Sequence, residues 1–122
     1  MNITEDYVSY EVAKLLKEKG FEGDINAYYH IWDSGNNVWS VQEFNSSEAP
    51  HLYIPAPTHQ IAMKWLREVH NLFICIEIGV KAYVWTITNT TDYVVVYIDV
   101  TVGTYEEAVE AALKYLLENL IL

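Results

Sequence analysis

Histidines are the residues of this chain that first suggest a metal site or acid–base chemistry, and there are four of them: His30, His51, His59 and His70. His59 and His70 lie at the two ends of one predicted helix, where a rise of about 1.5 Å per residue separates them by roughly 16 Å. One ion cannot bridge that distance. His30 and His51 would meet only through tertiary folding, and no short spacing with cysteine or a carboxylate supports either. We therefore predict no metal site.

Cys75 and Glu77 are the remaining candidates for catalysis, as a nucleophile and a general acid. Both fall in the apolar run 72–78, where burial of the thiol disfavours its reactive thiolate form. Glu77 follows on the same strand face, and a hydrogen-bonded or exposed carboxylate near the strand end is favoured there over an acid of raised pKa. The five glycines stand at the ends of predicted elements and form no phosphate-binding cluster. The sequence predicts no catalytic residue and no cofactor site.

The charge balance is strongly acidic, with 17 aspartate and glutamate residues against 7 lysine and arginine residues and a net charge of −10. This charge repels a phosphate backbone, so direct nucleic-acid binding is not expected. The acidity serves solubility, or it presents the chain to a basic partner, as an acidic inhibitor of a nucleic-acid enzyme would.

The expected location of the chain is the cytoplasm, without membrane contact. No apolar run approaches the roughly 20 residues that span a bilayer. The stretch 1–6 is polar and acidic, unlike a secretory signal, and the single Cys75 fits a reducing compartment.

The stretch 55–79 combines a proline stop, a helix cap, an amphipathic helix and an apolar strand, and the other elements are expected to pack around it. Pro55 and Pro57 hold the approach extended, and Thr58 is placed to cap the helix. The apolar residues recur at helical spacing as far as Val69, and the period changes to two in the strand 72–78. About one residue then joins helix and strand, which favours close packing of one on the other.

The remaining elements follow from the same two periodicities. The predicted helices are 9–20, or from 4, and 104–120, with Thr104 and Glu107 as a capping box. The other predicted strands are 27–32 and 38–44, which form a hairpin, and 83–88 and 93–102, which continue the strand 72–78 as an antiparallel meander. The fold class is therefore α+β, in the order α-β-β-α-β-β-β-α, with a mainly antiparallel five-stranded sheet and the helices packed on one face. Residues 1–122 are expected to form a single domain.

Ten tyrosines and four tryptophans are an unusual content for 122 residues. If the aliphatic strand faces meet the helices, the rings are left on the open face of the sheet. The candidate contact residues are Tyr28, Trp32, Trp85 and Tyr97. Such a face stacks bases, stacks sugars or closes against a second subunit, and the acidity disfavours bases. We predict a non-catalytic accessory protein that forms a homo-oligomer or binds a protein partner through this face; that the rings instead fill a two-sided core stays open.

A second hypothesis is a small-ligand-binding protein or an enzyme with a polar pocket beside the central helix. Its polar groups would be His30, His59 and Arg67. They converge only if the fold brings the hairpin against that helix, so the hypothesis requires a concave site that contains them.

Three segments, 14–21, 56–68 and 105–118, carry a likeness to other proteins, and the most specific is the run Pro-Thr-x-Gln-x-Ala-x-Lys-Trp-Leu-Arg-Glu at 57–68. With these segments the chain resembles a group of small uncharacterised proteins encoded by gut Bacteroides-type bacteria, their phages and integrated elements. The resemblance touches both ends and the middle of the chain and implies an intracellular accessory protein of bacterial or phage origin. It assigns no activity, substrate, cofactor or catalytic residue.

Overall fold

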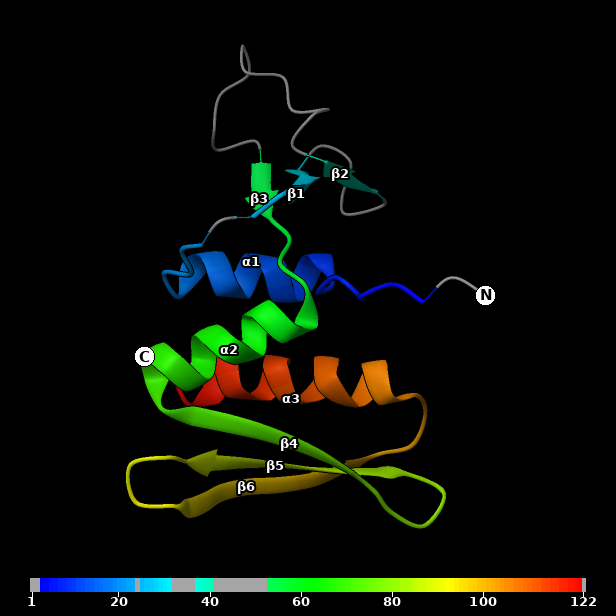
Figure 1. Cartoon of the computed structure of the whole chain (residues 1–122), viewed down its shortest axis with the longest axis vertical. Helices are drawn as coiled ribbons and strands as arrows, with labels where there is room; N and C mark the ends of the chain where they lie inside the picture. The colour runs from blue at the N-terminus through cyan, green and yellow to red at the C-terminus, as the bar shows by residue number, and fades with distance from the viewer. Residues whose placement is uncertain (1–2, 24, 32–36, 41–52, 122) are drawn as a thin grey trace.

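The computed structural model describes residues 3–23, 25–31, 37–40 and 53–121 (Figure 1). The helices are α1 (Tyr10–Glu18), α2 (His59–His70) and α3 (Tyr105–Asn119). The strands are β1 (Ala27–His30), β2 (Val38–Ser40), β3 (Tyr53–Pro55), β4 (Leu72–Ile78), β5 (Tyr83–Asn89) and β6 (Val94–Thr101). The predicted α+β class is confirmed, and the observed order of elements roughly matches the predicted one. The difference is β3, an additional short strand in the extended stretch before α2. The predicted strand ends at 32 and at 41–44 lie outside the described residues.

The strands form two sheets, and the prediction of one five-stranded sheet is wrong. One sheet has the order β2-β1-β3 and the other β4-β5-β6, both antiparallel. Figure 1 shows them at opposite ends of the molecule with the helices between. The short strand β3 pairs with β1 and contacts α1, so the hairpin buries its apolar side against that helix and does not extend the meander.

The helices begin where local chemistry predicts. The hydroxyl of Ser9 accepts the amide N–H of Val12 at 3.1 Å, so α1 begins after Ser9 and the alternative start at Thr4 is wrong. Thr58 and Thr104 cap α2 and α3 in the same way, the latter within the predicted capping box. These caps satisfy amides that a first helical turn leaves unpaired.

Asn71 alone joins α2 to β4, as the sequence predicts. Its φ of 57° is left-handed, a conformation that asparagine tolerates better than most residues. The reversal is tight, and α2 therefore packs directly on β4.

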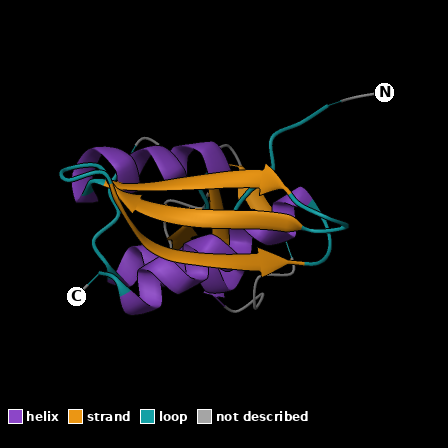
Figure 2. Ribbon diagram, turned by 90° about the horizontal axis from the view of Figure 1, so that it is seen from below, coloured by secondary structure: helices purple, strands orange, loops and turns teal. Residues whose placement is uncertain are grey.

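The larger sheet, β4-β5-β6, is covered by helices on one side. The side chains packed between this sheet and α3 are Ile74, Trp85, Ile87, Leu113, Leu116 and Leu117, all 8% exposed or less. Figure 2 views the sheet from its other side, with the three strands in front of the helices. Within the part of the chain that the structure describes, no element covers that side.

The expected division of the strand faces is wrong, because the tyrosine and tryptophan rings of β5 and β6 lie on the helix side. Trp85 is 3% exposed, and the ring of Tyr97 stacks on Tyr115 of α3 with centroids 3.7 Å apart. The physical reason is packing against α3, where Tyr115 contacts the rings of both Trp85 and Tyr97. Burying a ring removes more apolar area from water than burying valine or threonine does, so the β-branched residues are left outside.

Candidate functional site

The uncovered side of the larger sheet, here called the outer face, is an apolar surface built from alternate residues of all three strands. The register places Val84 between Glu77 and Val100, and Thr86 between Cys75 and Ile98. The complete outer face consists of Phe73, Cys75, Glu77, Val84, Thr86, Thr88, Val95, Val96, Ile98 and Val100.

The residues of β6 are the most exposed part of this face. Val95, Val96, Ile98 and Val100 are between 43% and 61% exposed. The register shifts next to Thr88, which pairs with Val95, so Val96 is the additional residue of a bulge. Two consecutive valines are therefore in solvent, where strict alternation would have turned one of them inward.

The edge of β6 is partly closed to further strands. Among the described strands β6 pairs with β5 alone. The amide N–H of Val94 donates to Asp92 at 3.1 Å, and that of Val100 donates to Asp99 at 2.7 Å. Carboxylates on edge amides and a bulge in the strand both disfavour edge-to-edge pairing. A partner is therefore better received by the outer face than by the edge.

Cys75 and Glu77 lie together on the outer face. The thiol Sγ is 3.7 Å from Oε1 of Glu77, and Cys75 is half-buried. Burial raises the pKa of the Cys75 thiol, and the charge and hydrogen bond of Glu77 raise it further. The thiol is protonated at neutral pH, which makes it a poor nucleophile.

A second polar site lies where the three helices meet. The Nε2 atom of His59, the first residue of α2, is 2.7 Å from Oε2 of Glu110 on α3. The amide N–H of Ser9, the cap of α1, donates to both carboxylate oxygens, at 3.2 Å and 3.1 Å. Burial would raise the pKa of Glu110, but the hydrogen bonds from His59 and Ser9 outweigh it and hold this pKa below the usual carboxyl range. An ionised carboxylate can only accept, so the 2.7 Å contact requires an N–H at Nε2 of His59, which donates a hydrogen bond to Oε2 of Glu110.

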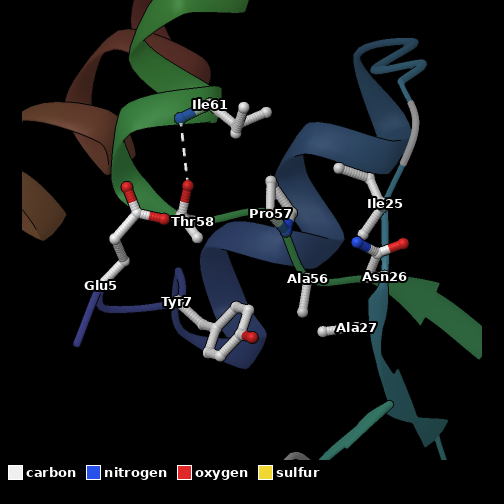
Figure 3. Close-up of a pocket in the computed structure, with 9 residues that line it drawn as sticks. All are labelled: Glu5, Tyr7, Ile25, Asn26, Ala27, Ala56, Pro57, Thr58 and Ile61. Carbon is white, nitrogen blue, oxygen red and sulfur yellow. Dashed lines mark hydrogen bonds between the residues drawn. The ribbon is translucent and has the colours of Figure 1, made fainter. Parts of the chain in front are cut away.

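Hollows lie beside this junction in the described part of the chain, and one of about 150 Å³ has His59 and Gln60 in its lining. Two others are larger. One, of about 440 Å³, is lined by Asp6, Tyr7, Ser9, His59, Glu106, Glu107 and Glu110. The other, of about 260 Å³, is shown in Figure 3, where Glu5 and Tyr7 approach the cap of α2 and the dashed line marks the bond from the Ile61 amide to Thr58. Within the described residues, no group of three or more histidine, cysteine or acidic side chains is placed to hold a metal ion.

The structure does not bring the predicted pocket residues together. His30 is 4% exposed on β1, with its ring 4.5 Å from that of Tyr53. Arg67 is exposed in the last turn of α2, about 12 Å along the helix from His59. His59 lines the hollow of about 440 Å³. Neither His30 nor Arg67 lines that hollow or the one of about 260 Å³.

The predicted contact residues are also dispersed. Tyr28 belongs to the smaller sheet, where its ring meets Tyr53 edge-on at 6.4 Å. Trp85 and Tyr97 lie on the helix side of the larger sheet, and Trp32 lies outside the described residues.

The predictions from the sequence included neither the outer face nor the hydrogen bonds that Glu110 accepts from Ser9 and His59. The run 94–98 is apolar at every position, and an uninterrupted run means that both faces of a strand are apolar, so this signal was present. Glu110 carries no comparable signal, because its partner His59 is 51 residues away in the chain.

Comparison of the chain with protein-family models, with curated proteins and with solved structures finds no match. In the described part of the chain, no helix has both the length and the apolar character that crossing a membrane requires.

Proposed function

We propose that this chain is a non-catalytic protein that self-associates by packing the outer faces of two copies against each other. The observation that carries the proposal is the uncovered aliphatic surface of β6 and its continuation over β5 and β4. The proposal keeps the self-association that the sequence predicted but assigns it to a different surface. Aliphatic residues of β6 stand on the uncovered side of the sheet, where aromatic rings were expected.

The apolar exposure is the first support. Complete burial of a valine or isoleucine side chain contributes about 1.5–3 kcal/mol. Four neighbouring side chains of β6 are each about half exposed, so roughly half of that contribution remains for an association to use. An apolar patch of a few hundred Å² is as large as a typical soluble monomer exposes, and such a patch is often functional.

The distribution of charge favours a second copy as the partner. The chain carries a net charge of −10, yet Glu77 is the one ionised residue among those of the outer face. A two-fold contact places the same surface on both sides of the interface. Two such faces pack about 10 Å apart with little like-charge repulsion between them, while the acidic residues of α3 stay on the far sides of the pair.

The size of the face sets the expected strength. Three strands at about 4.8 Å spacing and eight residues at about 3.3 Å rise give a footprint of roughly 14 by 26 Å. The area of this footprint is smaller than the roughly 800 Å² that each partner buries in a standard stable interface. The dimer is therefore expected to be weak and concentration-dependent, with a dissociation constant in the micromolar range.

Sedimentation velocity over about 1 to 500 µM tests the proposal. The test variant replaces Val96, Ile98 and Val100 by threonine, which keeps the β-branched shape and the strand preference while removing apolar surface. The matched control is Ile61→Thr, which alters an exposed isoleucine on α2. We expect the sedimentation coefficient of the wild type and the control to rise with concentration and that of the triple variant to stay constant. A wild type that sediments as a monomer throughout, or a triple variant that associates like the control, overturns the proposal.

A further inference from the structure

A shallow cleft of about 310 Å³ lies between the edge of β6 and the second half of α3, on the helix side of the sheet. It is separate from the outer face, which lies on the other side of β6. Its lining combines two aromatic rings with two carboxylates, from Trp85, Tyr115, Asp99 and Glu118.

The rings at this cleft are fixed by their neighbours. Tyr115 stacks on Tyr97 with an interplanar angle of 16°, and Trp85 lies 5.5 Å from Tyr97. The indole N–H of Trp85 donates to the hydroxyl of Thr101 at 2.9 Å. Ring faces carry negative partial charge and attract cations, and rings that are already held in place lose little freedom when a ligand binds.

The charges at the cleft favour a positive ligand. Asp99 accepts the hydroxyl of Tyr97 at 3.2 Å, which orients its carboxylate beside the rings. Lys114 also lines the cleft, but its Nζ atom is 3.0 Å from Oε1 of Glu11 on α1. Lys114 pairs with Glu11 and also interacts electrostatically with Glu118. One positive charge therefore stands against two carboxylates at the cleft, and the balance still favours a cation from solution.

We propose that this cleft binds a small organic cation, a quaternary or methylated ammonium group, against the half-buried ring of Tyr115, with Asp99 and Glu118 neutralising its charge. Trp85 is 3% exposed and contributes to the floor of the cleft. A weakly hydrated ammonium suits aromatic faces better than a metal ion does, because a metal ion needs several oxygen, nitrogen or sulfur ligands. A neutral sugar would use the rings but would gain nothing from the net charge of the carboxylates.

The probe is tetramethylammonium chloride, followed by NMR through the indole N–H signal of Trp85, which Trp85→Phe assigns. Sodium chloride at equal ionic strength controls for screening, and tert-butanol is a neutral group of similar size. We expect a saturable shift with tetramethylammonium alone, a several-fold weaker affinity in Asp99→Asn and in Glu118→Gln, and a stronger affinity in Lys114→Met, which removes a competing charge. Glu106→Gln, on the first turn of α3, is expected to leave the affinity unchanged.

Three outcomes overturn the inference. They are no saturable shift in the folded wild type, an equal response to tert-butanol or sodium chloride, and an affinity that neither Asp99→Asn nor Glu118→Gln reduces. Repeating the titration on the threonine triple variant separates this site from self-association, because the cleft and the outer face lie on opposite sides of the sheet.

Discussion

Replacing Glu110 by glutamine removes the charge at the point where the three helices meet. The carboxylate accepts the Ser9 amide and the His59 ring N–H, so one side chain connects the start of α1 and the start of α2 to the middle of α3. Glutamine keeps the size and one oxygen acceptor, but its NH₂ group must face one of the two donors.

The expected loss of stability follows from these contacts. A hydrogen bond to a charged group contributes about 1.5–3 kcal/mol. The bond to His59 is short, at 2.7 Å, whereas the Ser9 amide is shared between two oxygens at 3.1 Å and 3.2 Å. Because the Glu110 side chain is 26% exposed, water replaces part of what is lost. We expect Glu110→Gln to lower the free energy of unfolding by about 2–3 kcal/mol at neutral pH.

The pH dependence of this difference has a definite sign. The pKa of Glu110 is lower in the folded chain than its ordinary value. Its stabilising contribution is therefore complete above the ordinary carboxyl range of about 4 to 5 and is lost as the pH falls through the folded pKa. The difference in unfolding free energy between wild type and variant should be fully present at neutral pH and should shrink as the pH falls below about 4.

Urea unfolding followed by circular dichroism, at a series of pH values, measures this difference. The matched control is Glu106→Gln, one helical turn earlier on α3 and exposed, which should change stability by less than about 1 kcal/mol. Equal effects of the two substitutions, or a Glu110→Gln effect that stays constant as the pH falls, would refute the role assigned to the Glu110 carboxylate.

Three further predictions concern single residues. Gly20→Ala should cost about 1 kcal/mol in urea unfolding because φ is +87°, while the added methyl group meets no atom within 4 Å; no loss would contradict this. Thr104→Ala should cost about 1 kcal/mol by removing the cap of α3, again measured by urea unfolding, and an unchanged midpoint would argue against the cap. Cys75 should react slowly with iodoacetamide at neutral pH and faster at higher pH, and Glu77→Gln should speed the reaction by lowering the thiol pKa; mass spectrometry gives the rates, and equal rates would contradict the pairing.

Local features of this fold were predictable because short-range chemistry determines them. The capping residues Ser9, Thr58 and Thr104 satisfy the first amides of each helix wherever the helix packs. The single-residue joint at Asn71 follows from the change of period between α2 and β4.

Non-local features were not predictable in the same way. Whether the hairpin joins the meander depends on competition between pairing with β4 or β6 and packing on α1, which no residue pattern records. Which side of the larger sheet is buried depends on how the rings of Trp85 and Tyr97 pack against Tyr115 of α3. The composition suggested exposed rings, but packing against α3 places Trp85 and Tyr97 on the covered side of the sheet.

Isotope-filtered NOE spectroscopy on a mixture of ¹³C-labelled and unlabelled chains examines the contact between the outer faces most directly. Its readout is through-space transfer between methyl groups of different copies at a concentration where association is seen. We expect intermolecular cross-peaks among the methyl groups of Val96, Ile98 and Val100, and their loss in the threonine triple variant. A chain of monomeric mass at every concentration, or intermolecular cross-peaks confined to the helices or the smaller sheet, would contradict self-association through the outer face.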